Sequence, residues 1–250
     1  MRKVRGKPPL IAAHRGSSGV APENTIAAFR QAIADGADMI ELDVRMTSDF
    51  ELVVLHDRTV RRTTGRKGRI RNLSLNDLHS FDAGSWFGSE FAGERIPLLR
   101  NVIDILPSHV QLNIEVKTDG DRRKRQAFAE SLVLLLREKN FLSRVLVSSF
   151  NHKFLSRLHS IYPALRTGAL YMPVRDTGRK PSTLTRRIGA SAFICSIVQL
   201  RKRHAEDIHA NKLTLVCYGV NTRRQLNKAG KWGADIVITD YPKKMREYLN

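Results

Sequence analysis

Short apolar segments alternate along the chain with stretches of helical periodicity. Apolar residues recur every three or four positions at Ile26, Phe29 and Ile33, which predicts a helix that ends at Gly36. Strands are predicted for eight apolar segments, at residues 10–13, 39–44, 111–116, 144–148, 165–170, 192–195, 213–218 and 236–239. Such alternation builds a parallel sheet, and 250 residues suit a (β/α)8 or TIM barrel. We predict this α/β fold, with one domain over residues 1–250.

The pattern breaks after the second strand. Residues from about 56 to 97 carry turns rich in Gly, Arg and Ser, with only a short helical stretch at 75–81. The helical pattern then resumes at Leu99, Val102 and Ile103. Loops that follow barrel strands form the active-site face. A small insertion at this point is therefore expected to wall or cover a substrate pocket.

The chain is strongly basic, with 43 Lys and Arg against 24 Asp and Glu. The resulting field favours anionic partners such as a phosphorylated substrate, and it is compatible with peripheral contact with an anionic membrane. Nucleic acid is not expected, because aromatic residues make up only 7% and avoid the basic runs. Solvated surface is the favoured interpretation of the basic residues in 173–187, and a loop at the pocket rim is the alternative.

Neither end of the chain predicts a membrane segment. Basic residues precede an apolar stretch at 10–13 that is too short for a signal peptide. We expect no transmembrane segment, since no apolar run approaches about 18 residues, and a cytoplasmic location is the default. Cys195 and Cys217 lie in apolar runs without metal-ligand spacing, so we expect buried thiols.

Carboxylates occupy one face of two predicted strands. Because side chains alternate, Glu41 and Asp43 point into the barrel while the apolar residues between them face the helices. Glu115 and Lys117 lie likewise on the strand at 111–116. Three inward carboxylates provide oxygen ligands for Mg²⁺ or Ca²⁺, whereas a single one is more often part of a structural ion pair. Removing any one of them is expected to stabilise the metal-free protein slightly.

Two histidines and two cations are expected at the same face. His14 follows the first strand and His56 follows the apolar run at 52–55, and histidine suits proton transfer near neutral pH. Either histidine alone would more often be structural. Arg15 and Lys117 supply donors that match phosphate oxygens. A metal, two proton carriers and two phosphate-binding cations together predict phosphoester chemistry.

The sequence resembles the glycerophosphodiester phosphodiesterase family over nearly its whole length. The resemblance is carried by His14-Arg15-Gly16, Pro22-Glu23-Asn24-Thr25, Glu41-Leu42-Asp43-Val44, His56-Asp57, Arg62-Thr63-Thr64, Asn113-Ile114-Glu115-Val116-Lys117 and Thr239-Asp240-Tyr241-Pro242. It implies a TIM barrel with a small insertion after strand two that hydrolyses glycerophosphodiesters to sn-glycerol 3-phosphate and an alcohol. The ordered combination is far more specific than any one of these motifs.

Family roles transfer to matching positions. The resemblance assigns Glu41, Asp43 and Glu115 to a divalent metal ion, His14 and His56 to acid-base catalysis, and Arg15 and Lys117 to the phosphate. It also implies attack by the glycerol 2-hydroxyl, followed by opening of the cyclic phosphate by water. We predict that His14 is the base, because it adjoins Arg15, and that His56 is the acid.

One departure affects the expected pocket. Where the family usually carries Trp-Thr-Val-Asn, this chain reads Tyr218-Gly219-Val220-Asn221, so Tyr218 is predicted to contact substrate. A lysophospholipase D acting on lysophospholipids is the alternative enzyme. A non-catalytic polyanion or nucleic-acid binder is the alternative of another class. The sequence indicates neither the alcohol, the choice of metal nor the oligomeric state.

Overall fold

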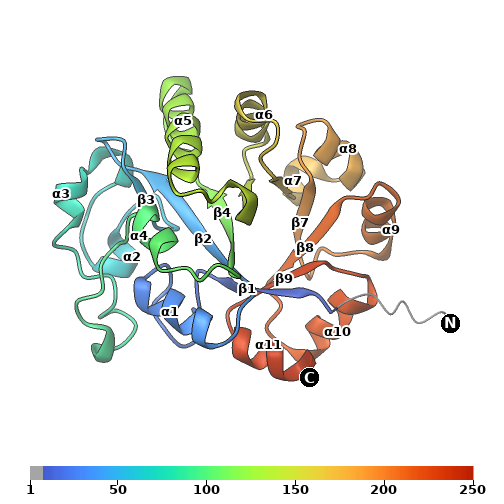
Figure 1. The fold of residues 1–250 in the computed structure, drawn as a ribbon, viewed down its shortest axis with the longest axis horizontal. Helices are drawn as coiled ribbons and strands as arrows, with labels where there is room; N and C mark the ends of the chain where they lie inside the picture. The colour runs from blue at the N-terminus through green and yellow to red at the C-terminus, as the bar shows by residue number, and fades with distance from the viewer. Residues whose placement is uncertain (1–7, 250) are drawn as a thin grey trace.

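Eight parallel strands form a closed barrel in the computed structural model, which describes residues 8–249 (Figure 1). Their order around the barrel is β1-β9-β8-β7-β6-β5-β4-β2, and pairing of β1 with β2 closes the ring. The strands are β1 (Leu10–His14), β2 (Met39–Met46), β4 (Gln111–Val116), β5 (Val145–Ser149), β6 (Thr167–Leu170), β7 (Ala192–Ser196), β8 (Thr214–Tyr218) and β9 (Ile236–Thr239). The predicted TIM-barrel fold is confirmed.

Helices surround the strands in Figure 1. They are α1 (Ile26–Ala34), α2 (Arg61–Thr64), α3 (Leu75–Leu78), α4 (Leu99–Asp104), α5 (Arg122–Glu138), α6 (His152–Ile161), α7 (Pro173–Asp176), α8 (Pro181–Arg186), α9 (Lys202–Ala210), α10 (Arg223–Lys231) and α11 (Pro242–Leu249). Short 3-10 helices cover Ile70–Asn72, Ser89–Phe91 and Leu142–Arg144. The predicted helix before Gly36 is α1, and the Thr25 hydroxyl caps it by accepting from the Ala28 N–H.

The alternation of β2 decides which side chains face the interior. Ile40, Leu42 and Val44 are buried in the core between the strands and the helices of the first half of the chain. Glu41 and Asp43 are turned the other way, into the barrel, and are also buried. The apolar face of β2 packs toward the helices, so its opposite face places the two carboxylates inside the barrel.

The insertion has a small core of its own. It follows β3 (Leu52–Val54), a strand that pairs antiparallel with the end of β2 and was not predicted from the sequence. Buried apolar residues hold the segment together: Val53, Leu55, Val60, Ile70, Leu78, Ala83 and Ile96. Figure 1 shows it beside the barrel, where α2 and α3 lie. The insertion is therefore packed structure rather than an open loop.

The remaining sequence expectations concern the cysteines, membrane segments and two groups of basic residues. Cys195 and Cys217 are buried free thiols, as predicted. No helix within residues 8–249 is long and apolar enough to cross a membrane. The basic residues considered as a signal-peptide start, Arg2 to Lys7, lie outside the described residues. The basic segment at 173–187 forms α7 and α8, and its Lys and Arg residues are exposed, as favoured by its composition; three of them also line a cavity.

Candidate active site

Three carboxylates converge inside the barrel near the carboxyl ends of β2 and β4. Glu41, Asp43 and Glu115 each place one oxygen so that the three atoms lie within 4.8 Å of one another. In the strand register, Asp43 is paired with Glu115, which brings the two strands' carboxylates together. We call these three residues the carboxylate cluster. Its separation matches oxygens on one Mg²⁺ or Ca²⁺ ion, whose ligand distances are about 2.0–2.6 Å.

Two cations lie against this cluster. Lys117 Nζ forms ion pairs with Glu115 and, at 3.1 Å, with Asp43 Oδ1. Arg15 Nε lies 3.1 Å from Asp43 Oδ2. Both predicted phosphate-binding residues are thus held beside the carboxylates, and Asp43 is the residue that they share.

The cations divide the cluster into unequal members. Burial and the neighbouring Asp43 raise the pKa of Glu41 to about 7 in the metal-free protein. Burial also opposes ionisation of Asp43, but Lys117 and Arg15 outweigh it and lower the pKa of that carboxyl. Asp43 is therefore a stabilising counter-ion in the folded protein, whereas ionisation of Glu41 is opposed by its burial and by the negative charges of Asp43 and Glu115.

The sequence led us to expect that removing any one of the three carboxylates stabilises the metal-free protein slightly. The contrast between Asp43 and Glu41 changes this expectation. In EDTA, Asp43→Asn is predicted to lower the free energy of unfolding by about 1–3 kcal/mol, because two partly buried cations lose the carboxylate that they share while each keeps one other partner. Glu41→Gln is predicted to leave it unchanged or to raise it, because repulsion is relieved. Thermal unfolding of the two variants measures the difference. Equal shifts in the two melting temperatures would contradict this division of charge.

His14 forms a pair with an aspartate from the other end of the chain. Its Nδ1 lies 2.6 Å from Asp240 Oδ1, and Asp240 also accepts from Asn221 Nδ2 at 2.6 Å and from the Ser18 hydroxyl at 3.2 Å. Since a carboxylate only accepts, Nδ1 carries the proton and Nε2 is left as the basic nitrogen. Burial lowers the pKa of His14, but the Asp240 hydrogen bond and nearby Glu41 outweigh it and raise the pKa overall.

His56 has a corresponding aspartate beside it in the sequence. Its Nδ1 lies 2.8 Å from Asp57 Oδ1, and Arg62 donates to the other oxygen of Asp57 at 2.8 Å. Arg45 donates to the His56 carbonyl through Nε and Nη2, at 2.9 and 2.5 Å. Burial lowers the pKa of His56 below its ordinary value. The two histidines thus differ in the direction of their pKa shift.

The loop after β1 is shaped by unusual backbone angles. Arg15 and Gly16 both have positive φ, 54° and 83°. A Cβ on Gly16 would lie 2.6 Å from backbone atoms of Ala28, so only glycine lets the loop pack on α1. This turn aims the Arg15 N–H at Glu41, 3.1 Å away. The turn thereby joins Arg15 to the carboxylate cluster.

Glu23 and Asn24 link this loop to its surroundings. Glu23 accepts from Arg15 Nη1 at 2.8 Å and from two nitrogens of Arg62, which belongs to the insertion. Asn24, also at positive φ, donates to Asp43 Oδ2 at 3.0 Å. The insertion therefore contacts the site through ionic and hydrogen-bonded side chains.

Tyr218 lies at the end of β8 and is partly buried against the small apolar cluster within the barrel. Burial raises the pKa of its hydroxyl.

A cavity of about 280 Å³ opens beside the carboxylate cluster. Its lining residues include Arg45, Arg58, Glu115, Lys117 and Asn151. The structure thus gathers every residue predicted for the site at one end of the barrel.

Several polar partners were given no role by the sequence interpretation: Glu23, Asn24, Arg45, Asp57, Arg62, Asn221 and Asp240. Asp240 directly follows β9. Residues at the carboxyl ends of barrel strands form the active site, and this rule, which indicated His14 after β1, could also have indicated Asp240. Arg45 continues the inward alternation of Asp43 on β2. Glu23 lies in the loop before α1 and Arg62 in α2, and both belong to motifs that carry the family resemblance, although nothing in those motifs indicates that the two side chains pair.

The chain is similar to known proteins over most of its length. The model of the glycerophosphoryl diester phosphodiesterase family matches residues 14–244. A glycerophosphodiester phosphodiesterase of Caldanaerobacter subterraneus subsp. tengcongensis is 37% identical, over 94% of this chain and 96% of its own. Human lysophospholipase D GDPD1 is 25% identical, over 95% of this chain and 85% of its own.

A solved structure is similar throughout. It is an Oleispira antarctica phosphodiesterase in complex with the product sn-glycerol-3-phosphate, 28% identical to this chain. The match covers 96% of each chain with a TM-score of 0.87. The likeness therefore extends over the whole barrel as well as the motifs of the site.

Proposed function

We propose, from the premise that this chain belongs to the glycerophosphodiester phosphodiesterase family, that its carboxylate cluster holds a divalent cation and its two histidines move the protons. The reaction is hydrolysis of a glycerophosphodiester to sn-glycerol 3-phosphate and an alcohol. The observation that carries the proposal is the convergence of three carboxylate oxygens within 4.8 Å, flanked by Arg15 and Lys117.

The donor set fits a hard divalent cation. Three carboxylates offer only oxygen ligands, which Mg²⁺ and Ca²⁺ prefer, and their charge exceeds what Lys117 and Arg15 neutralise once Glu23 also pairs with Arg15. A bound cation would offset the negative charge that develops on the phosphoryl oxygens. Lys117 and Arg15, which flank the carboxylates, would contact those oxygens.

The histidines are suited to opposite proton transfers. We assign His14 Nε2 to remove the proton from the glycerol 2-hydroxyl as its oxygen bonds to phosphorus. His56 donates a proton to the alcohol oxygen as its bond to phosphorus breaks. Water then opens the cyclic phosphate with the proton transfers reversed, which regenerates both histidines. Asp240 and Asp57 act as positioning residues, since each fixes one ring nitrogen of its histidine.

A substrate panel tests the proposal. Release of sn-glycerol 3-phosphate is measured from glycerophosphocholine, glycerophosphoethanolamine and glycerophosphoglycerol with Mg²⁺ or Ca²⁺, and again with EDTA. Turnover that EDTA abolishes and either ion restores is expected, and the more effective ion identifies the metal. Turnover that persists in EDTA would argue against the metal site.

A lysophospholipid belongs in the same panel. The similarity to human lysophospholipase D is the observation that favours this second activity. If lysophosphatidylcholine is hydrolysed faster than glycerophosphocholine, the lysophospholipase D activity is the principal reaction.

The cellular location of the protein is a separate question. The cytoplasmic location expected from the sequence stays a prediction.

Tyr218 is proposed to contact the substrate, because it stands at the inner end of β8 where the family usually carries Trp. Tyr218→Trp is expected to change the relative rates across the panel by about tenfold to a hundredfold, the range for a changed pocket contact. Tyr218→Phe, which keeps the ring, serves as the control for the hydroxyl. An unchanged order of preference in Tyr218→Trp would place this side chain away from the substrate.

A further inference from the structure

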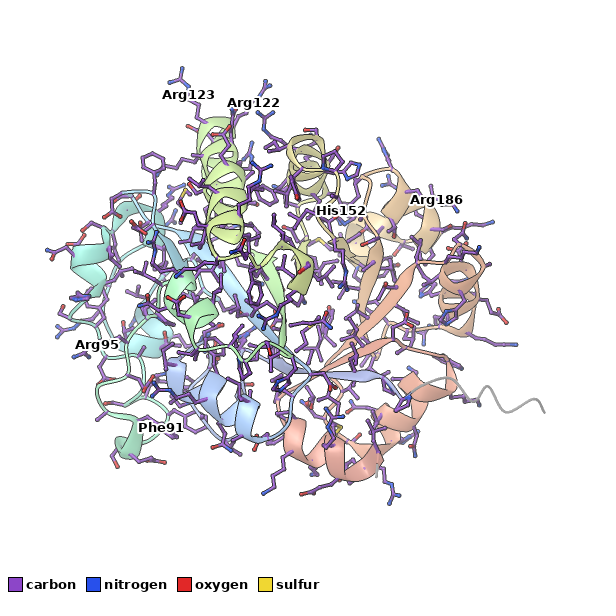
Figure 2. All side chains as sticks on the ribbon, viewed as in Figure 1. Phe91, Arg95, Arg122, Arg123, His152 and Arg186 are labelled. Atoms are coloured by element: carbon purple, nitrogen blue, oxygen red, sulfur yellow. The ribbon has the colours of Figure 1, made fainter. Side chains whose placement is uncertain are left out.

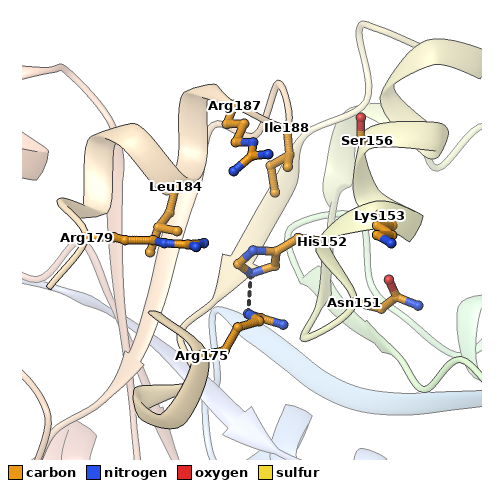
Figure 3. Close-up of a pocket in the computed structure, with 9 residues that line it drawn as sticks. All are labelled: Asn151, His152, Lys153, Ser156, Arg175, Arg179, Leu184, Arg187 and Ile188. Carbon is orange, nitrogen blue, oxygen red and sulfur yellow. Dashed lines mark hydrogen bonds between the residues drawn. The ribbon is translucent and has the colours of Figure 1, made fainter. Parts of the chain in front are cut away.

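A basic cavity lies outside the carboxylate cluster, between α6 and the segment that forms α7 and α8. Its volume is about 410 Å³. Four basic residues line it: Lys153, Arg175, Arg179 and Arg187. The other lining residues are Asn151, His152, Ser156, Leu184 and Ile188. Figure 3 shows the guanidinium groups of Arg179 and Arg187 pointing toward the ring of His152. None of the residues that line this cavity is acidic.

Arg175 is held rigidly in this wall. Its Nε and Nη2 donate to the two oxygens of Asp176 at 2.8 and 2.7 Å, and its Nη1 donates to the Phe150 carbonyl at 2.6 Å. Asp176 is fully buried and also accepts from the Met172 N–H. Its single charge is therefore taken by Arg175. Within residues 8–249, no carboxylate lies within ion-pair distance of Lys153, Arg179 or Arg187.

The four cations are exposed residues, but they line one cavity and so lie close to one another. Like charges that face one cavity repel each other, whereas basic side chains on an open surface separate into water. In Figure 2 the side chains of Arg186 on α8 and of Arg122 and Arg123 on α5 extend outward, as expected of basic residues on an open surface. Arg186 and Arg187 are neighbours in sequence, yet only Arg187 lines the cavity. The cavity therefore concentrates positive charge that an anion would neutralise.

We propose that this cavity binds a dianionic phosphate group. Guanidinium groups present paired donors that match phosphate oxygens, and a terminal phosphate carries about −1.5 to −2 charges near pH 7. A phosphodiester carries only one charge, so the cavity favours the chemical class of the product over that of the substrate. Asn151 lines both this cavity and the one beside Glu115 and Lys117, so the two sites are neighbours.

Inorganic phosphate is the probe, titrated calorimetrically into wild-type protein and into the double variant Arg179→Gln/Arg187→Gln. The variant is expected to lose one bound phosphate, or to bind it about tenfold or more weakly. The matched control, Arg122→Gln/Arg186→Gln, removes the same charge from outward-facing side chains and should bind as wild type. Turnover of glycerophosphocholine without phosphate should be unchanged in both. Equal phosphate stoichiometry and affinity in wild type and the cavity variant would overturn the proposal.

Further arms identify the source of the phosphate. Competition by sn-glycerol 3-phosphate points to a soluble monoester, whereas sedimentation with phosphatidic acid vesicles that is lost in the cavity variant points to a lipid headgroup. Phosphatidylcholine vesicles are the control. Dimethyl phosphate, a singly charged diester, should compete poorly. Equal competition by dimethyl phosphate and inorganic phosphate would refute the preference for a dianion.

Discussion

Replacing Glu41 with Gln, Asp43 with Asn or Glu115 with Gln is expected to lower kcat by about a hundredfold to a thousandfold. Losing a group that stabilises transition-state charge commonly costs about 3–4 kcal/mol of activation free energy. Each change replaces one of the three carboxylates, whose oxygens lie within 4.8 Å of one another, by a neutral amide. Metal affinity and initial rates on glycerophosphocholine measure the effect.

The control separates metal binding from folding. Glu138→Gln makes the same chemical change on the exposed end of α5 and should leave rate, metal affinity and melting temperature as in wild type. Circular dichroism should show that the three cluster variants keep the barrel fold. Wild-type activity and metal affinity in any of them would exclude that residue from the proposed metal site.

The two histidines should respond differently to the leaving group. His56→Gln is expected to reduce hydrolysis of glycerophosphocholine by about 10² to 10⁴, the usual contribution of a positioned proton donor. A glycerophosphodiester with p-nitrophenol as leaving group should be nearly unaffected, because p-nitrophenolate departs without a proton. The ratio of the two rates measures the acid role.

His14→Gln provides the comparison. Attack by the 2-hydroxyl is common to both substrates, so this variant should slow both to a similar extent. In the metal-free protein the pKa of His14 is raised and that of His56 is lowered, so the resting protonation states do not favour this assignment and the two rates decide it. Rescue of the activated substrate in the His14 variant alone would reverse the assignment.

Local sequence pattern accounts for much of the site. Alternation on β2 predicted that Glu41 and Asp43 face inward, and the apolar residues between them are indeed packed against the helices. The same reasoning placed Glu115 beside them on the next barrel strand. These inferences depend only on the period of a strand and on the closure of a barrel, both of which are local or general rules.

The insertion was predicted in position but not in its role. Its turn-rich composition marked residues 56–97, yet nothing in that composition indicated that Arg62 would bind Glu23. The pairing joins the loop before α1 to α2, between residues 39 positions apart in sequence. Composition reports that a segment departs from helix and strand, whereas its contacts depend on how it folds back on the barrel.

The sequence by itself determined the fold class, the inward carboxylates and the candidate chemistry, because periodicity and motif order are encoded in neighbouring residues. Only the tertiary structure decided which charges meet. Asp240 reaches His14 because β9 pairs with β1 as the barrel closes, and Arg187 rather than Arg186 lines the cavity between α6 and α8. Distances between side chains remote in sequence are set by packing of the whole chain, so no local pattern contains them.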